Sequence, residues 1–191
     1  MNIAFCIGNG VSREKLNLEL LTGKGVTYGC NHLIETFPLD NTIVVDRMPL
    51  VTMLSKGLHT KTKLYTRRKW RSAIDVPINY LNPPMNNIRH RWDIEIHWGS
   101  GTHALNLAAE DGADIVVMIG YDLYGNVDPA CWIYQIEKLF EKYPDTQFVQ
   151  IQPKGWKTPA TWTAENFSVD DFVALKKLLQ DLPTKTVDDD K

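Results

Sequence analysis

The stretch IHWGSGTHALNLAAEDGADIVVMIGYDLYG, residues 96–125, indicates the fold of the chain. Small residues at 99–101 open a run of apolar residues at helical spacing, which predicts a helix buried on one face. Gly112 ends this helix, since glycine readily adopts a positive φ. The continuous apolar run 115–119 is typical of a parallel strand covered on both faces. The stretch therefore predicts a loop, a helix, a strand and a second loop, as in an α/β protein.

Two edges of this stretch face the region beyond the carboxyl ends of the strands, where α/β proteins bind ligands. One is the helix N-terminus at 99–102, and the other is the strand end at 120–124. A polar cluster follows the strand: Tyr121, Asp122, Tyr124, Asn126 and Asp128. We expect ligand contacts from both edges: Gly99, Ser100, Gly101, Thr102, Gly120 and Asp122.

The amino-terminal segment carries a second ligand-binding pattern. The apolar run 2–7 predicts a strand that leads into Gly8-Asn9-Gly10-Val11-Ser12 and a helix expected over 12–21. This is the Rossmann-type arrangement, in which glycines let the backbone approach a phosphate or nucleotide and Ser12 caps the helix. The turn has neither a P-loop sequence nor a full GxGxxG, so a tight turn without a ligand is the alternative.

Two further strands deliver polar residues to the same edge. The strand 26–30 is followed by Asn31, whose amide suits a base or a sugar, with the capping of a short helix as an equal alternative. The strand 41–45 is followed by Asp46 and Arg47. Charges directly after a buried strand are costly unless they are paired or lie at a site. We expect a ligand-binding role here, with a structural ion pair as the alternative.

The remaining periodic patterns predict further helices over 49–57, 129–143 and 169–182, and further strands over 63–66 and 146–151. The expected fold class is α/β, a single Rossmann-like domain over 1–182 with a mostly parallel central sheet and helices on both faces. A flexible acidic tail is expected at 183–191.

Basic side chains gather at 59–71 and 89–91, beside Trp70 and Trp92. Such interleaving suits a polyanionic acceptor or nucleotide phosphates, whereas a solvated face is the commoner explanation. The formal net charge of -2 argues against a protein that is basic throughout and coats nucleic acid. The long irregular connection 75–95 is typical of a functional lid or a binding loop.

Composition indicates a soluble globular protein, since 43% of the residues are hydrophobic and 23% are charged. Cys6, Cys30 and Cys131 form an odd count without CxxC spacing, so we expect buried reduced thiols and a reducing compartment. The start lacks a signal-peptide pattern, and no run approaches about 18 apolar residues. We therefore expect a cytoplasmic protein without a membrane span.

Motifs of metal sites and of serine hydrolases are missing from the sequence. The histidines show no HxxxH or HExxH spacing, no mid-chain Asp-x-Asp stands ready for a divalent ion, and GxSxG is absent. We therefore expect no metal and no cofactor. The chemistry that remains is nucleotide or sugar recognition by strand-end polar groups and helix N-termini.

Two parts of the chain together resemble the bacterial lipooligosaccharide sialyltransferases. In that family a strand ends in Gly-Asn-Gly-x-Ser and the next strand delivers an asparagine, as in IAFCIGNGVS followed by TYGCNHLIETF. The stretch 96–125 resembles the second hallmark, a Ser-Gly that opens a helix and a strand that ends in Gly-x-Asp-x-Tyr. The resemblance covers roughly residues 2–150. Residues 44–47 and HWGSG also look like uncharacterised phage proteins labelled glycosyltransferase-like, in which case the host cytoplasm is expected.

The resemblance implies a variant of the GT-A glycosyltransferase fold and metal-independent transfer from a CMP- or UDP-linked sugar. It implies that the turn Gly8, Asn9, Gly10 and Ser12 cradles the phosphate and the ribose. It further implies that Asn31 and the Ser100–Gly101 backbone contact the donor, and that Asp122 holds the ribose or the cytosine.

The resemblance also implies catalytic roles. Tyr124 would stabilise the departing phosphate by hydrogen bonding. The family places a general-base histidine after the Gly-x-Asp-x-Tyr strand, and this chain has no histidine beyond His103. Asp128 falls near the expected place, and a carboxylate can act as a base. His97 is the other candidate, with a hydrogen-bonded strand-end histidine as its structural alternative.

The acceptor implied by the basic clusters at 59–71 and 89–91 is a glycan or a modified nucleic acid. Two other functions stay open. One is a non-catalytic module that binds a nucleotide or a sugar, and the other is a virion-associated structural protein with a vestigial pocket. The sequence carries no expectation of the oligomeric state.

Overall fold

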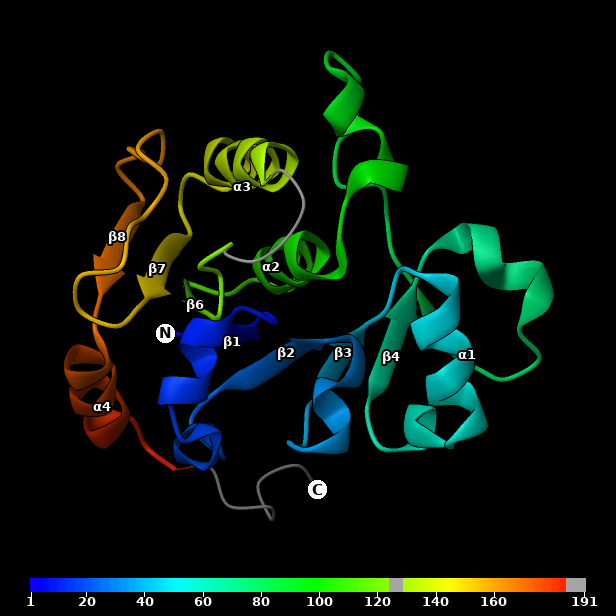
Figure 1. The fold of residues 1–191 in the computed structure, drawn as a ribbon, viewed down its shortest axis with the longest axis horizontal. Helices are drawn as coiled ribbons and strands as arrows, with labels where there is room; N and C mark the ends of the chain where they lie inside the picture. Colours follow the sequence, from blue (N-terminus) through cyan, green and yellow to red (C-terminus); the bar gives the residue numbers. More distant parts are fainter. Residues whose placement is uncertain (124–128, 185–191) are drawn as a thin grey trace.

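The structure, a computed structural model, describes residues 1–123 and 129–184 (Figure 1). Eight strands form one sheet in the order β5-β4-β3-β2-β1-β6-β7-β8, and all neighbouring pairs are parallel. The strands are β1 (Ile3–Ile7), β2 (Val26–Cys30), β3 (Asn41–Ile43), β4 (Lys63–Thr66), β5 (Asn79–Tyr80), β6 (Ile115–Ile119), β7 (Gln147–Ile151) and β8 (Phe167–Asp170). The α/β class with a parallel sheet is confirmed.

Helices connect these strands. The α-helices are α1 (Arg47–Ser55), α2 (Ser100–Glu110), α3 (Ala130–Lys142) and α4 (Phe172–Asp181). The 3-10 helices are η1 (Val11–Lys15), η2 (Leu18–Leu21), η3 (Asn31–Glu35), η4 (Leu58–Thr60), η5 (Arg68–Ala73), η6 (Arg91–Asp93) and η7 (Glu95–His97). None of the helices in residues 1–123 and 129–184 is long and apolar enough to cross a membrane.

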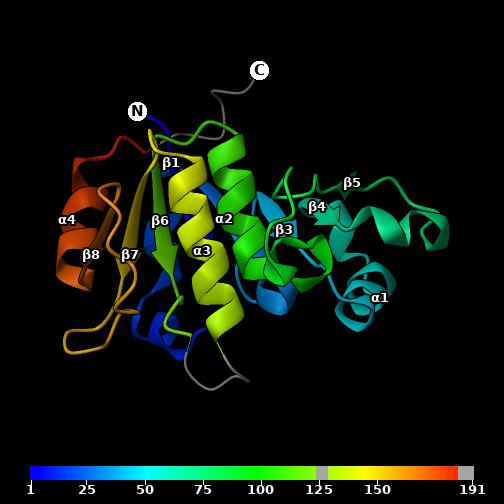
Figure 2. The same cartoon turned by 90° about the horizontal axis from the view of Figure 1, so that it is seen from above.

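The apolar core lies in two layers, one on each face of the sheet. Figure 2 shows helices α2 and α3 covering one of these faces. Side chains alternate along a strand, so Ala4 and Cys6 of β1 pack toward α2 and α3. Phe5 and Ile7 pack on the other face, in the layer that contains the apolar residues of α1 and α4. Helices on both faces explain why β1 and β6 are almost continuously apolar, since neither face of these strands meets water.

The sheet changes direction at β1. The chain runs outward from β1 through β2, β3 and β4 to β5, and then returns to place β6 on the other side of β1. A crevice forms beyond the carboxyl ends of the strands at such a switch point, and this is where ligands bind in open α/β sheets. Just past the paired residues of β1 and β6, the Gly8 N–H donates to Ile119 O at 2.8 Å, and the Gly10 N–H donates to Gly120 O at 2.9 Å. The turn after β1 is therefore bonded to the end of β6.

The helix predicted over 12–21 is wrong, because η1 and η2 replace it. Leu16 has an extended backbone, with φ -111° and ψ 132°, which ends the first turn of helix. Asn17 then starts the second turn, since its side-chain oxygen accepts from the Glu19 N–H at 3.1 Å. An asparagine that caps competes with continued helix, so the apolar spacing alone was misleading.

Two edge strands were not predicted. Strand β5 occupies two residues within the irregular connection 75–95, and β8 covers part of the segment assigned to a loop and a helix start. The last helix consequently begins at Phe172 rather than at 169. Its N-cap is Asp171, whose carboxylate accepts from the N–H groups of Val173 and Ala174 at 2.9 and 3.0 Å. Cys6 and Cys30 are buried free thiols, as expected, whereas Cys131 is free and half-buried.

Candidate functional site

A cavity of about 230 Å³ lies beyond the carboxyl ends of β1, β2, β3 and β6, at the switch point of the sheet. Its lining comes from the turns Gly8–Gly10 and Gly99–Gly101, the segments at the ends of β2, β3 and β6, and helices α2 and α3: Gly8, Asn9, Gly10, Cys30, Asn31, Asp46, Gly99, Ser100, Gly101, Thr102, Gly120, Tyr121, Leu123, Trp132 and Ile136. All predicted ligand-binding residues except Ser12, Arg47 and Asp122 line it. Segments from far apart in the sequence thus meet at one place.

The first wall of the cavity is the turn Gly8–Gly10. The Arg13 guanidinium holds this turn from behind, because its Nη1 donates to Gly8 O at 2.9 Å and to Asn9 Oδ1 at 3.0 Å. The Asp122 carboxylate holds its far end, because Oδ2 accepts from the Ser12 N–H at 2.6 Å. Ser12 and Asp122 are buried and join the turn to the end of β6. The observed contact of Asp122 is therefore with the turn, and the carboxylate does not line the cavity.

The second wall is the turn Gly99–Gly101 at the N-terminus of α2. Arg67, which follows β4, holds it from behind, because its Nη2 donates to Ile96 O at 3.0 Å and to Trp98 O at 2.6 Å. The Arg67 side chain is only 5% exposed, and burial lowers its pKa below the usual value. The interpretation of Arg67 as part of an acceptor-binding basic cluster at 59–71 is therefore wrong, since its guanidinium is committed inside the protein.

Asn31 and Ser100 are joined by hydrogen bonds at the cavity wall. The Val45 N–H donates to Ser100 Oγ at 3.3 Å, and Ser100 Oγ donates to Asn31 Oδ1 at 3.2 Å. The amide oxygen of Asn31 is thereby occupied, which leaves its amide nitrogen as a donor toward the cavity. Asn31 has a positive φ of 51°, a conformation that asparagine tolerates better than most residues. Both predicted residues thus lie in the cavity with defined orientations.

Asp46 lines the cavity and Arg47 does not. Asp46 is the N-cap residue of α1, yet its side chain makes no capping hydrogen bond. One reason is that Pro49 occupies the third helical position and has no N–H to donate. No hydrogen bond or ion pair joins the Asp46 carboxylate to another residue in the described part of the chain. The structural alternative, an ion pair with Arg47, is absent among these residues.

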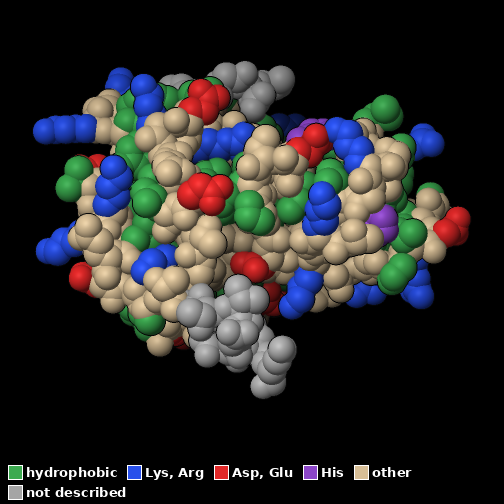
Figure 3. Space-filling view, turned by 90° about the horizontal axis from the view of Figure 1, so that it is seen from below, with side chains coloured by type: hydrophobic (Ala, Val, Ile, Leu, Met, Phe, Trp, Pro, Cys, Tyr) green, Lys and Arg blue, Asp and Glu red, His purple; other side chains and the backbone are tan. Residues whose placement is uncertain are grey.

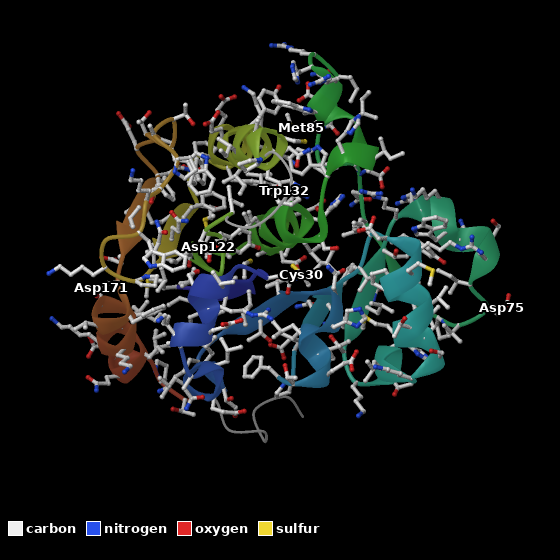
Figure 4. The ribbon with its side chains drawn as sticks, viewed as in Figure 1. Cys30, Asp75, Met85, Asp122, Trp132 and Asp171 are labelled. Carbon is white, nitrogen blue, oxygen red and sulfur yellow. The ribbon has the colours of Figure 1, made fainter. Side chains whose placement is uncertain are left out.

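Three lining residues lie outside both predicted ligand-facing edges and the predicted turn: Cys30, Trp132 and Ile136. Tyr121 and Leu123 belong to the predicted edge 120–124 but were not among the named ligand contacts. Burial raises the pKa of the Cys30 thiol to about 12, so this thiol is a neutral part of the wall and not a nucleophile. The Tyr121 hydroxyl donates to Gly101 O at 2.9 Å and braces the second turn. Figure 4 shows Trp132 of α3 and Cys30 of β2 reaching the same central region from different elements.

The catalytic predictions have separate outcomes. Tyr124 and Asp128 lie outside the described residues. His97 is the last residue of η7, and its exposed side chain does not line the cavity. In residues 1–123 and 129–184, no group of three or more His, Cys, Asp or Glu side chains is placed to hold a metal ion.

The second basic cluster, 89–91, borders a different cavity of about 410 Å³, which Arg89 helps to line together with Asp93, Tyr134, Lys138 and Lys142. Most of these groups already have partners within the protein. Lys138 pairs with Glu141 at 2.6 Å, and Asp93 accepts from the Tyr134 hydroxyl at 2.9 Å. On the face shown in Figure 3, Lys and Arg side chains are dispersed among other side chains and form no continuous patch.

No family model matches the chain, and no curated protein matches it in sequence. Solved structures do match. One is the sialyltransferase CstII from Campylobacter jejuni in complex with a substrate analogue, cytidine-5'-monophosphate, with 14% identity over 81% of each chain and a TM-score of 0.53. Another is CstII in complex with CMP-3FNeuAc, with 12% identity over 78% of this chain and 80% of that chain and a TM-score of 0.51. This chain therefore has a sialyltransferase-like α/β fold.

Proposed function

We propose that this protein binds a nucleotide-activated sugar in the cavity and transfers the sugar to an acceptor, as a metal-independent glycosyltransferase. One observation carries the proposal. The cavity lies at the switch point of the sheet between two glycine-containing turns, in a fold shared with an enzyme solved with CMP and with CMP-3FNeuAc. We propose that this chain, like that enzyme, binds a nucleotide-activated sugar.

The second wall suits the phosphate of such a donor. The first N–H groups of a helix have no partner within the helix, and the helix dipole favours negative charge there. In α2 these groups belong to Ser100, Gly101 and Thr102, all of which line the cavity. Arg67, bonded to the carbonyls just before the helix, adds a fixed positive charge behind it. A phosphate at this N-terminus would thus be stabilised without a metal ion.

The proposed reaction is a direct displacement at the anomeric carbon. The acceptor hydroxyl oxygen forms a bond to that carbon, the bond to the phosphate oxygen breaks, and the nucleotide leaves with the electron pair. The hydroxyl proton passes to the carboxylate of Asp128 or the imidazole of His97, and Tyr124 donates a hydrogen bond to the leaving phosphate. These three assignments rest on the sequence resemblance.

The acceptor proposed is a glycan or a modified nucleic acid that contacts the exposed residues of the two basic clusters. Within the cluster 59–71, Arg67 is excluded, while Arg68 and Lys69 stay exposed. Lys69 lies over the Trp70 ring at 4.5 Å, and Arg91 lies over the Trp92 ring at 5.2 Å. These cation–aromatic pairs offer flat surfaces that suit a sugar ring or a base.

A non-catalytic binding module is the second candidate. One observation favours it, namely that the His97 side chain does not reach the cavity lining. Asp128→Asn and His97→Ala separate the two functions. Loss of sugar transfer or of donor hydrolysis in either variant, with donor binding retained, supports catalysis. A protein that binds the donor but turns over none of it, in any variant, supports the binding module.

The experiment that tests donor binding is a thermal-shift titration with CMP, UDP, GDP and ADP at millimolar concentration. A ligand that binds the folded state raises the free energy of unfolding by RT ln(1 + [L]/Kd), so one nucleotide should raise the Tm. Asn31→Gly removes the amide and keeps the positive φ, and it should abolish the shift. Asn82→Gly, an exposed asparagine that does not line the cavity, is the matched control and should retain it. Flat curves with every nucleotide would contradict the proposal.

A further inference from the structure

The charge that lines the cavity has one sign. Asp46 is the only charged residue among the described residues of the lining. The Arg13 guanidinium donates to Gly8 O and Asn9 Oδ1, and the Arg67 guanidinium donates to Ile96 O and Trp98 O. Neither arginine lines the cavity.

The Asp46 carboxylate is available for a ligand. The contrast with Asp171, the other aspartate at an α-helix N-cap, shows this directly. Asp171 accepts two backbone N–H groups of its own helix, at 2.9 and 3.0 Å, whereas Asp46 accepts none from α1. Asp171 also lies far from the labelled cavity residues (Figure 4). An aspartate at an N-cap usually stabilises its helix. Asp46 instead leaves its carboxylate without a capping hydrogen bond at the cavity, and it interacts with Arg67 only through space, which partly offsets the lowering of the Arg67 pKa by burial.

Asp46 lies beside the proposed phosphate position at the N-terminus of α2, because Ser100 Oγ accepts a hydrogen bond from the N–H of Val45, the residue before Asp46. Neighbouring strands are about 4.8 Å apart, so the end of β3 lies about 10 Å from the end of β1 across the sheet. The Gly8–Gly10 turn follows β1, and Asn31, Ser100 and Asp46 line the part of the cavity toward β3. A nucleotide on the Gly8–Gly10 turn with its phosphate at the N-terminus of α2 therefore places the sugar that is bonded to this phosphate next to Asp46.

We propose that the donor sugar is uncharged, and that Asp46 is the residue that selects it. This inference rests on the proposed function. A carboxylate accepts hydrogen bonds from sugar hydroxyl groups and repels the carboxylate of an acidic sugar. Asp46 is the charged side chain that the described lining presents to the sugar, whereas Arg67 lies behind the second turn and is bonded to backbone carbonyls, so an acidic sugar meets a like charge at the cavity wall. The ligand class is therefore a nucleotide bonded to a neutral, hydroxyl-bearing sugar.

The test compares ligands that differ only in the charge of the sugar. UDP-glucose and UDP-glucuronic acid differ by one carboxylate, and CMP-sialic acid differs from CMP by an acidic sugar. Affinities are measured by isothermal titration calorimetry for the wild type, for Asp46→Asn and for Asp75→Asn. The last is a matched control, because Asp75 is exposed and lies far from the cavity (Figure 4).

If the wild type accepts uridine nucleotides, UDP-glucose should bind at least about tenfold more tightly than UDP-glucuronic acid. If it accepts cytidine nucleotides, CMP-sialic acid should bind no more tightly than CMP. Asp46→Asn keeps the shape and removes the charge, so the preference should fall to less than about threefold. Asp75→Asn should leave it unchanged.

Three results would overturn the inference. One is tighter binding of the acidic sugar in the wild type, and another is a preference for the neutral sugar that Asp46→Asn leaves intact. In both cases the nucleotide-sugar function stands and only the selection by Asp46 falls. The third is binding of no nucleotide and no conjugate, which overturns the proposed function together with the inference.

Discussion

The two glycine-containing turns of the cavity differ in why they contain glycine. A Cβ atom at Gly10 would lie 2.5 Å from both Asp122 Oδ2 and Gly120 O, and one at Gly8 would lie 2.6 Å from Gly120 O. A Cβ atom at Gly101, in contrast, would lie 3.5 Å from its nearest neighbour, the Tyr121 ring. The protein's own packing requires the glycines of the first turn. The second turn has room for a side chain at Gly101, although a Cβ atom at Gly99 would lie 3.2 Å from Trp132 Nε1. Packing therefore does not require glycine at position 101, and we propose that glycine there serves the approach of a ligand.

Gly10→Ala should have the largest effect. Gly10 has φ -64° and ψ 147°, which alanine adopts easily, so the cost is steric and comes from the clash with Asp122 and Gly120. Overpacking against backbone that cannot move away should lower the free energy of unfolding by about 3 kcal/mol. Urea denaturation measures this as a lower midpoint at an unchanged m-value. A stability equal to that of the wild type would contradict the packing explanation.

Acid should loosen the helix that carries the second turn. His103 of α2 is fully buried, and burial, with a smaller effect of Arg67, lowers its pKa from 6.5 to about 3. In the unfolded chain His103 becomes protonated as the pH falls through 6.5, whereas in the folded chain it stays neutral until about pH 3. The contribution of neutral His103 to the free energy of unfolding is therefore fully present above pH 6.5 and is lost as the pH falls from 6.5 toward 3. Between pH 7 and pH 5 the loss should be about 2 kcal/mol.

The control for this prediction is His103→Gln, which cannot titrate. Whatever its stability at pH 7, its free energy of unfolding should change less between pH 7 and pH 5 than that of the wild type. The difference between the two pH dependences, measured by urea denaturation at both pH values, reports His103 alone. Identical pH dependences would show that His103 does not couple to folding.

Asp122→Asn should have a smaller effect on the first turn. The bond from the Ser12 N–H to the Asp122 carboxylate is charge-assisted, and a neutral amide oxygen replaces it with a weaker bond of similar shape. We expect a loss of about 1 kcal/mol in the free energy of unfolding. Asp75→Asn should be neutral in the same urea titration. The affinity for the nucleotide should fall only slightly, in line with the small loss in the free energy of unfolding. A complete loss of binding at unchanged stability would instead indicate that Asp122 contacts the ligand directly.

Gly101→Ala should have the smallest effect on stability, within about 0.5 kcal/mol of the wild type. The added methyl group makes an ordinary contact with Tyr121, and alanine favours helix more than glycine does. The same methyl group narrows the cavity at the helix N-terminus, so the affinity for the nucleotide identified by thermal shift should fall about tenfold. Paired urea and thermal-shift measurements separate the two effects. If Gly101→Ala destabilised the protein as much as is expected for Gly10→Ala, packing would require glycine in both turns and the proposed difference between them would be wrong.

Local patterns in the sequence predicted the central sheet well. The apolar runs of β1, β2 and β6 are followed by Gly8, Asn31 and Gly120, and such strand and turn signals depend on neighbours in the chain. The edge strands β5 and β8 lacked this signal, because they are short and owe their conformation to pairing with β4 and β7. Pairing at an edge is a tertiary contact, which a window of sequence does not contain.

The sequence predicted only those parts of the cavity that local patterns mark, because a local pattern does not contain tertiary contacts. Gly99 and Ser100 mark a helix start, so their place beyond the strand ends could be expected from the sequence. Trp132 and Ile136 share a helical spacing that also suits a core position, and only the packing of α3 against α2 makes them part of the cavity. Asp122 was expected to face a ligand. Its partner, the Ser12 N–H, lies 110 positions away in the chain and could not be inferred from spacing.

The pairing of β1 with β6 has a consequence for biosynthesis. Ile3 pairs with Ile115, so strand β1 leaves the ribosome well before its partner β6 has been synthesised. At 5–20 residues per second this delay is about 6–20 s. During that time one edge of the apolar strand Ile3–Ile7 stays unpaired, and parallel, non-local pairing is intrinsically slow. The cavity is complete only when the Gly8–Gly10 turn is bonded to the end of β6, so a nascent chain cannot form it before residues 119 and 120 have been synthesised.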